Sequence, residues 1–232
     1  DNAIDILSTH IAKGLINRSY MFIGPEGIGK SHLAVRFAQT VISPRDGNPT
    51  SPNLESATAK AIEQGTFGDV QILGASESSK TDQVFTQDLR AAVRRVSLTA
   101  FNSKNQFIIF AADSLTGNGM NAMLKLLEEP PGDTTLVILT DSPNNFPATI
   151  RSRCYDIVLR PLPKERLASI LVEQDLVDGT DEALKYAILA GGRYGKAISM
   201  INDSSFLMTL EVIIEDIAKY SFAAIPDRLD YS

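Results

Sequence analysis

The chain has 232 residues, 44% of them hydrophobic and 22% charged, which is the composition of a globular protein with one large domain or two modest ones. It carries 28 acidic and 22 basic residues, a formal net charge of -6, so we do not expect the basic surface of a protein that grips DNA by itself. Its single cysteine excludes an internal disulfide and a multi-cysteine zinc site, and no apolar run approaches the roughly 20 residues of a membrane span.

The chain opens without a basic region or an apolar run, so no signal peptide is visible, and we expect a cytoplasmic protein without a membrane partner. The missing initiator Met indicates a trimmed chain. Arg90, Arg94 and Arg95 are a local exception to the acidic balance and fall on one predicted helix. We interpret them as a solvated helix face rather than a nucleic-acid patch.

Strands alternate with helices over the first 160 residues. Apolar residues at helical spacing predict an opening helix over 4–15, whereas short apolar runs that stop at turn residues predict buried strands. Residues 43–55 are polar and rich in proline, which indicates a loop or an insertion. Because the strands are continuously apolar, we expect a parallel sheet covered by helices on both faces. The predicted strands are 20–23, 69–73, 107–111, 135–140 and 155–159, and the helices between them are marked by residues 33–41, 57–64, 89–96 and 120–127.

From Pro163 onward the strand signals stop and helical patterns take over. The patterns predict helices over 165–174, 181–190, 196–201 and 206–220, with Thr180 as the N-cap of the second. The predicted organisation is therefore an α/β domain over 1–160, a small all-helical domain over 161–204, and the beginning of a further helical domain over 205–232.

Residues 24–31, with the sequence GPEGIGKS, match the phosphate-binding pattern G-x-x-x-x-G-K-S between a predicted strand and a predicted helix. Glycines at Gly24, Gly27 and Gly29 let the backbone curl so that its N–H groups point at phosphate oxygens, and the following helix favours an anion at its N-terminus. Lys30 is expected to reach the β- and γ-phosphates, and Ser31 to contact Mg²⁺. This context favours an ATP–Mg site over a chance match.

Hydrolysis of ATP requires more than this loop. A second strand should end in an acidic residue that holds the metal, with a further group that orients the attacking water. Strand 107–111 continues into Ala112, and its first acid is Asp113, which is better explained as a helix- or turn-capping residue than as a metal ligand. The sequence therefore predicts a nucleotide pocket with weak or absent hydrolysis.

Three further segments carry a family resemblance: NAMLKLLEEPP at 121–131, LTD at 139–141 and IRSRC at 150–154. In this order behind the phosphate-binding pattern, they closely resemble the bacterial clamp-loader AAA+ family, and best its delta-prime branch. The resemblance covers residues 4 to about 201. It implies a P-loop AAA+ sheet domain, a helical lid domain and the start of a helical collar domain.

The resemblance also implies roles for single residues. Arg153 matches the arginine finger that the family supplies to the ATP of a neighbouring subunit; a surface or interdomain salt bridge is the alternative. Thr140 matches the sensor-1 position, although it is as well explained as a strand-terminating threonine. Lys196 falls near the sensor-2 position, with Arg193 as the second candidate, and either residue could instead cap a helix.

The chain also departs from the family. Hydrolysing relatives have an Asp-Glu pair that would fall near residues 110–112, where no acid stands. The family's four-cysteine zinc module is replaced by the polar stretch 43–55, so we expect no zinc and no other metal site within the protein itself. Only the first collar helix, 206–220, has room in this sequence, so we expect the chain to be a fragment.

These observations leave three hypotheses for function. The leading one is a largely non-hydrolysing clamp-loader subunit of DNA polymerase III that donates Arg153 to a neighbour. Its partners would be the other subunits of a hetero-oligomeric ring and, through that ring, a sliding clamp and primed DNA. The second is an active ATPase motor, which Lys30 and Ser31 motivate. The third is a scaffold with a vestigial phosphate loop.

Overall fold

The computed structural model describes residues 2–73, 82–99, 105–112, 115 and 117–203. The chain divides between Arg160 and Pro161 into two compact units, and each is described by itself. Among the described helices, none has both the length and the apolar character that crossing a bilayer demands.

The first unit is built on a five-stranded parallel sheet with the strand order β4-β5-β6-β1-β7. All seven residues of β6 are buried, and so are the first five residues of β5, because neighbouring strands and helices surround these two strands. The predicted parallel α/β sheet is thus confirmed. The strands are β1 Ser19–Ile23, β4 Val70–Leu73, β5 Gln106–Ala111, β6 Thr134–Thr140 and β7 Tyr155–Val158.

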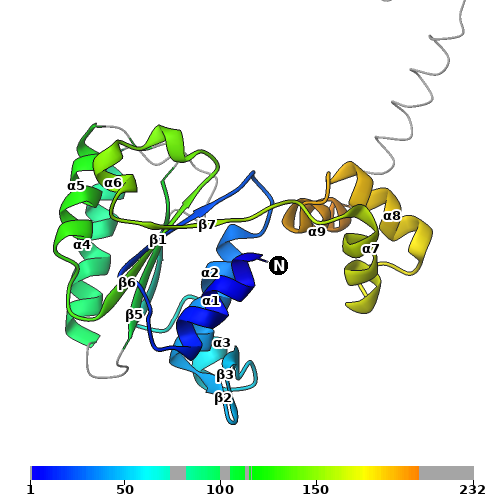
Figure 1. Ribbon diagram of the computed structural model, residues 1–232, viewed down its shortest axis with the longest axis horizontal. Coiled ribbons are helices and arrows are strands. Elements are labelled where there is room, and N and C mark those ends of the chain that lie inside the picture. The colour runs from blue at the N-terminus through cyan, green and yellow to red at the C-terminus, as the bar shows by residue number, and fades with distance from the viewer. Residues whose placement is uncertain (1, 74–81, 100–104, 113–114, 116, 204–232) are drawn as a thin grey trace, which may run out of the picture. The chain divides into compact units, whose positions relative to one another are not determined.

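Helices cover both faces of this sheet (Figure 1). One face carries α1 Asn2–Ala12, α2 Lys30–Ile42 and α3 Ala57–Glu63, and the opposite face carries α4 Asp82–Thr99 and α5 Gly117–Glu128. Side chains alternate between the faces, so Tyr20 and Phe22 of β1 pack with α2 whereas Met21 packs with α4 and α5. The alternation produces a separate hydrophobic cluster on each face.

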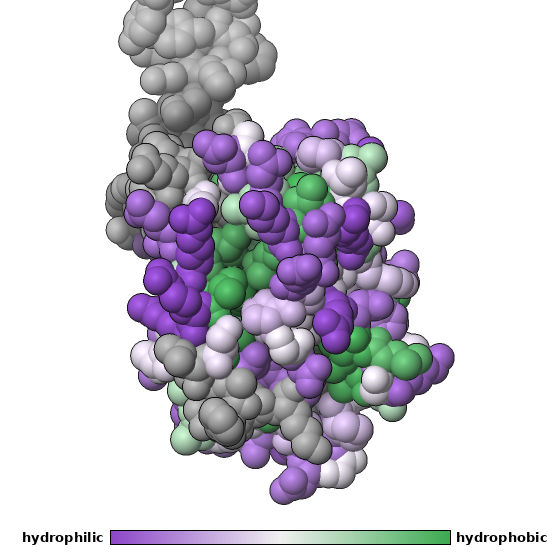
Figure 2. Space-filling model, turned by 90° about the vertical axis from the view of Figure 1, so that its left-hand side faces the viewer, coloured by the Kyte–Doolittle hydropathy of each residue, from purple (hydrophilic) through white to green (hydrophobic). Residues whose placement is uncertain are grey.

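The α4–α5 side of the unit is viewed in Figure 2, where hydrophilic residues surround a hydrophobic strip. Val93, Met120 and Leu124 on these helices are partly buried against the core. Arg90, Arg94 and Arg95 are exposed on α4, and an Nη1 group of Arg95 donates to the Gln71 side-chain oxygen at 3.4 Å. The arginines therefore lie on the solvent side of α4.

Residues 43–55, which the sequence predicts as a loop or an insertion, contain a short hairpin of β2 Pro44–Arg45 and β3 Asn48–Pro52. Its two-residue turn is Asp46-Gly47, with Gly47 at a φ of 74°. Glycine adopts this positive φ without the strain that a side chain would cause. The prolines that indicated a loop are compatible with strands here, since the two strands are short, pair only with each other and contain no buried residue.

The second unit is all-helical over its described residues, as predicted. It consists of α7 Lys164–Glu173, α8 Thr180–Leu189 and α9 Tyr194–Asn202, packed around Leu167, Leu171 and Ala187. The prediction for Thr180 is wrong, because Gly179 is the N-cap of α8 and no side chain caps that end. Thr180 is instead the first helical residue. The predicted helix 206–220, and with it the third domain, lies outside the described residues.

Candidate nucleotide site and arginine turn

The phosphate loop, residues 24–31, connects β1 directly to α2. Its first amide, that of Gly24, donates to the Thr140 carbonyl of β6 at 3.1 Å, which anchors the loop at the carboxyl ends of two adjacent parallel strands. Ligands of open α/β sheets bind at this end of the strands. The predicted strand–turn–helix context is therefore present.

Glycine is required in this loop for two physical reasons. Gly29, the N-cap of α2, has a φ of 107°, a left-handed backbone that other residues adopt only with strain. Gly24 has an ordinary backbone, but a Cβ there would lie 2.9 Å from the Leu159 carbonyl oxygen. The pattern's glycines thus serve both the turn and the close approach of two backbone segments.

Lys30 begins α2 and folds back over the loop. Its ammonium donates to the carbonyl of Gly24 at 2.5 Å and to that of Pro25 at 3.3 Å. The N-cap of α2, Gly29, has no side chain with which to cap the helix, and the first turn of α2 contains no acid. Ser31 is exposed. Left-handed glycines, a first helical turn without an acid and a lysine over the loop together fit an anionic phosphate group.

Thr140 lies beside the loop through its backbone. Its side chain is fully buried, and its hydroxyl donates to the Ser142 carbonyl at 3.1 Å and accepts from the Ser142 amide at 3.1 Å. This hydroxyl therefore closes the turn that follows β6. The Thr140 backbone therefore lies next to the phosphate loop, whereas its side-chain hydroxyl bonds to Ser142.

The acids that hydrolysis would require are missing from the end of β5. Residues 106–112 include none, and the amide of Ala112 donates to the Leu139 carbonyl at 3.2 Å, which extends the pairing with β6. Asp113 lies outside the described residues. Within the described part of the chain, no three His, Cys, Asp or Glu side chains gather as metal ligands would.

The arginine turn, residues 151–154, follows the short helix α6 Ala148–Arg151. Arg153 is exposed, and its Nη1 group donates to the Thr149 carbonyl at 2.7 Å. Its Nη2 group forms an ion pair with Glu128, the last residue of α5, at 3.1 Å. The surface salt bridge that the sequence allowed for Arg153 therefore exists within the first unit. Its partner was not predicted, since 25 residues separate the two side chains and no local pattern connects them.

Cys154, next to Arg153, lies in a different environment. Its side chain is half-buried and packs against the hydrophobic cluster under α4 and α5. Burial, and then the negative charge of Asp156, raise the pKa of the Cys154 thiol to about 12. The thiol is therefore neutral at ordinary pH, and Cys154 anchors the turn by packing.

The two sensor-2 candidates belong to the second unit. Arg193 is the N-cap of α9, and its Nε group donates to the Ala190 carbonyl at 2.9 Å, so it joins the end of α8 to the start of α9. Lys196 lies in the first turn of α9 and is half-buried. Both positions are therefore fixed within a helical unit separate from the one that contains the phosphate loop.

A phosphate loop after the first strand of a parallel sheet, followed by a helical unit, defines a P-loop protein with the AAA+ fold. A variant of Thermotoga maritima RuvB shares this fold, with a TM-score of 0.56 at 14% identity, over 90% of this chain and 61% of that one. A family model described as "DNA polymerase III, delta subunit" matches residues 1–163. The chain therefore belongs to this family, one of bacterial clamp-loader subunits, and the predicted resemblance is confirmed.

Curated relatives are also named as subunits of DNA polymerase III. The chain is 31% identical over 172 residues to the DNA polymerase III subunit delta' of Bacillus subtilis, which covers 74% of this chain and 50% of the relative. It is 27% identical over 209 residues to the DNA polymerase III subunit tau/gamma of Haemophilus influenzae, covering 88% of this chain and 30% of that relative. The chain thus spans half or less of the length of these relatives.

Proposed function

We propose that this chain is a delta-prime-like clamp-loader subunit of DNA polymerase III. In this role it hydrolyses little or no ATP itself and donates Arg153, as an arginine finger, to ATP bound by a neighbouring subunit. One observation carries the proposal: the Arg153 guanidinium is exposed and oriented by two contacts, whereas residues 106–112 end their strand without an acid. A guanidinium fork neutralises the charge that develops on a transferring phosphoryl group.

The proposed role as a clamp-loader subunit implies the interaction partners of the chain. The subunit joins other clamp-loader subunits in a hetero-oligomeric ring in the cytoplasm, and it meets the sliding clamp and primed DNA through that ring. The formal net charge of -6 suits a subunit that mainly touches proteins. We further propose that residues 161–204 act as the lid domain and that 205–232 begin the collar.

The test of the finger is a ring reconstituted with the full-length chain, in which Arg153→Ala is compared with Arg151→Ala. Arg151, the last residue of α6, is exposed two residues before Arg153 and lacks the Glu128 pair, so it is a matched control. Arginine fingers contribute about 10³–10⁵-fold to rate, and DNA-stimulated hydrolysis at the neighbouring site should fall by that order for Arg153→Ala alone. Equal rates for the two variants would exclude the finger.

The phosphate loop supports a separate proposal, that the chain binds ATP with Mg²⁺ in its own pocket. Gly24, Gly27 and Gly29 would cradle the phosphates with their amides, Lys30 would move from the loop carbonyls onto the phosphates, and Ser31 would reach the metal. The negatively charged phosphates of bound ATP would accept hydrogen bonds from the loop amides and from Lys30. Thr140 and Lys196 are the proposed sensors of that nucleotide.

Binding and hydrolysis should be measured separately on the same sample. Titration with a fluorescent ATP analogue should show binding that Lys30→Ala abolishes, with no turnover in either protein. A turnover that depends on Lys30 would favour the active motor. Absence of binding would favour the scaffold with a vestigial loop.

A further inference from the structure

The ion pair between Glu128 and Arg153 joins two elements that are distant in the sequence. Glu128 ends α5 and Arg153 follows α6, and the Oε1–Nη2 distance is 3.1 Å. The two side chains are 47% and 39% exposed, respectively. An exposed pair of this kind contributes little to folding stability, because water screens the charges and two long side chains lose rotamer freedom. A contribution to folding stability therefore does not explain well why this ion pair is present.

The geometry of the Arg153 guanidinium explains the ion pair better. Nη1 is held by the Thr149 carbonyl at 2.7 Å, and Nη2 is held by Glu128. Contacts on two different nitrogen atoms fix the plane of the group as well as its position. A guanidinium has five N–H donors, and these two hydrogen bonds use only two of them. The guanidinium thus retains donors for a further acceptor, and its side chain is 39% exposed.

We infer that Glu128 is a positioning residue for Arg153, which orients the guanidinium before a neighbouring subunit's nucleotide arrives. The inference rests on the proposed function of Arg153 as a finger. A side chain that is already oriented loses less conformational freedom on contact with the phosphate, so more of the interaction remains to accelerate the reaction.

The size of the effect follows from the exposure of the pair. A contact as weak as a surface ion pair biases the orientation of Arg153 by about two- to fivefold. In the reconstituted ring, Glu128→Ala should therefore lower kcat of the Arg153-dependent site by about two- to fivefold. KM for ATP should stay unchanged, since a finger acts on charge that develops in the transition state. Glu128→Gln should fall in between, because its amide oxygen still accepts a hydrogen bond.

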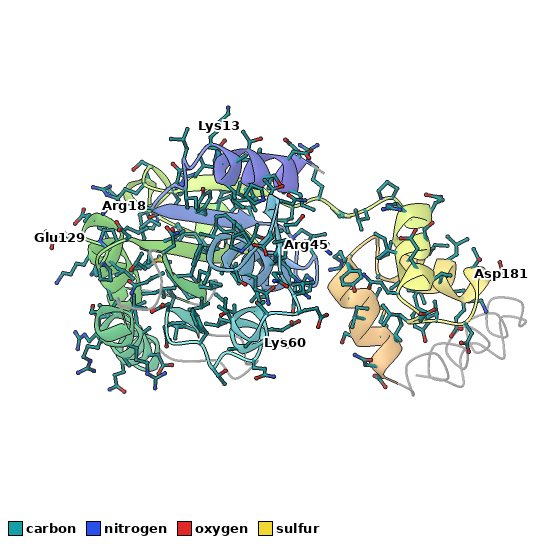
Figure 3. All side chains as sticks on the ribbon, turned by 90° about the horizontal axis from the view of Figure 1, so that it is seen from below. Lys13, Arg18, Arg45, Lys60, Glu129 and Asp181 are labelled. Carbon is teal, nitrogen blue, oxygen red and sulfur yellow. The ribbon has the colours of Figure 1, made fainter. Side chains whose placement is uncertain are left out.

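Glu129 provides the matched control. It is the next residue in the chain, is also exposed, and forms none of the ion pairs recorded between described residues. Figure 3 shows its side chain at the outer edge of the first unit. Glu129→Gln removes the same charge and should keep kcat. The thermal midpoints of all these variants should agree, because the substituted side chains are exposed.

A double-mutant cycle separates positioning from any other role of Glu128. In an Arg153→Ala background, Glu128→Ala should have no further effect on kcat. The inference is overturned by a loss of equal size in that background, by an unchanged kcat in the single variant, or by a faster rate, which would mean that Glu128 sequesters the arginine. If Arg153→Ala alone has no effect, the finger itself is refuted, and this outcome is distinguishable from the others.

Discussion

The phosphate loop and the arginine turn belong to the same sheet domain, but the first is shaped by its backbone and the second presents a side chain. The loop is a single stretch of chain whose shape depends on main-chain conformation, with Gly29 left-handed and Gly24 against the Leu159 carbonyl. The arginine turn presents the exposed Arg153 side chain, whose orientation depends on Glu128 from another helix. A site made by the backbone is encoded locally, whereas a site made by a side chain relies on residues far away in the sequence.

The largest expected effect concerns the shape of the Arg153 side chain. Arg153→Lys keeps the positive charge but loses the planar fork, in which two separate nitrogen atoms bond to Thr149 and Glu128. Most of the roughly 10³–10⁵-fold contribution of the finger should be lost in the reconstituted ring. Nucleotide affinity at the chain's own phosphate loop, measured by titration, should stay unchanged. A fully active Lys variant would show that charge alone suffices.

The next effect contrasts Cys154 with its exposed neighbour Arg153. With a pKa of about 12 against the ordinary 9.0, the Cys154 thiol has about 10³-fold less thiolate than a free cysteine at pH 8. Since the raised pKa lies above the assay range, alkylation by iodoacetamide should rise about tenfold per pH unit up to pH 10. In the unfolded chain the rate should level off near pH 9 instead. A plateau in the folded protein would contradict the buried environment.

The smallest effect concerns the backbone of the phosphate loop. A Cβ at Gly29 has open space within 4 Å, so Gly29→Ala isolates the conformational cost of a φ of 107°. We expect a loss of about 1–3 kcal/mol in the free energy of unfolding, measured with urea, together with weaker nucleotide binding.

Gly117→Ala is the control for this prediction. Gly117 begins α5 without a left-handed φ, and a Cβ there also meets open space. Alanine should therefore leave stability unchanged or raise it by about 0.4–1 kcal/mol. Equal effects of the two substitutions would mean that the loop tolerates side chains at Gly29, and its glycine pattern would lose its physical basis.

Much of the fold was predictable because its elements carry local signals. The apolar run at β6 predicts a strand, and the short apolar run before Gly24 predicts the strand that feeds the phosphate loop. Helix ends were less predictable: α4 begins at Asp82, although the apolar stripe marks only residues 89–96. The apolar stripe identifies the helix face that packs against the sheet, whereas the helix ends depend on tertiary contacts at those positions. Thr180 illustrates the same limit, since Gly179 precedes it at the cap.

The sequence by itself determined the phosphate loop, the parallel sheet and the family, because each depends on residue types at fixed spacings within one stretch. The tertiary structure alone decided the surroundings of Arg153: Glu128 lies 25 residues away, and only the packing of α5 beside α6 brings the two together. It also decided that Cys154 is a neutral packing residue beside an exposed arginine, since burial depends on the whole core. The sequence identifies the chemical groups, whereas long-range packing sets their orientation and charge.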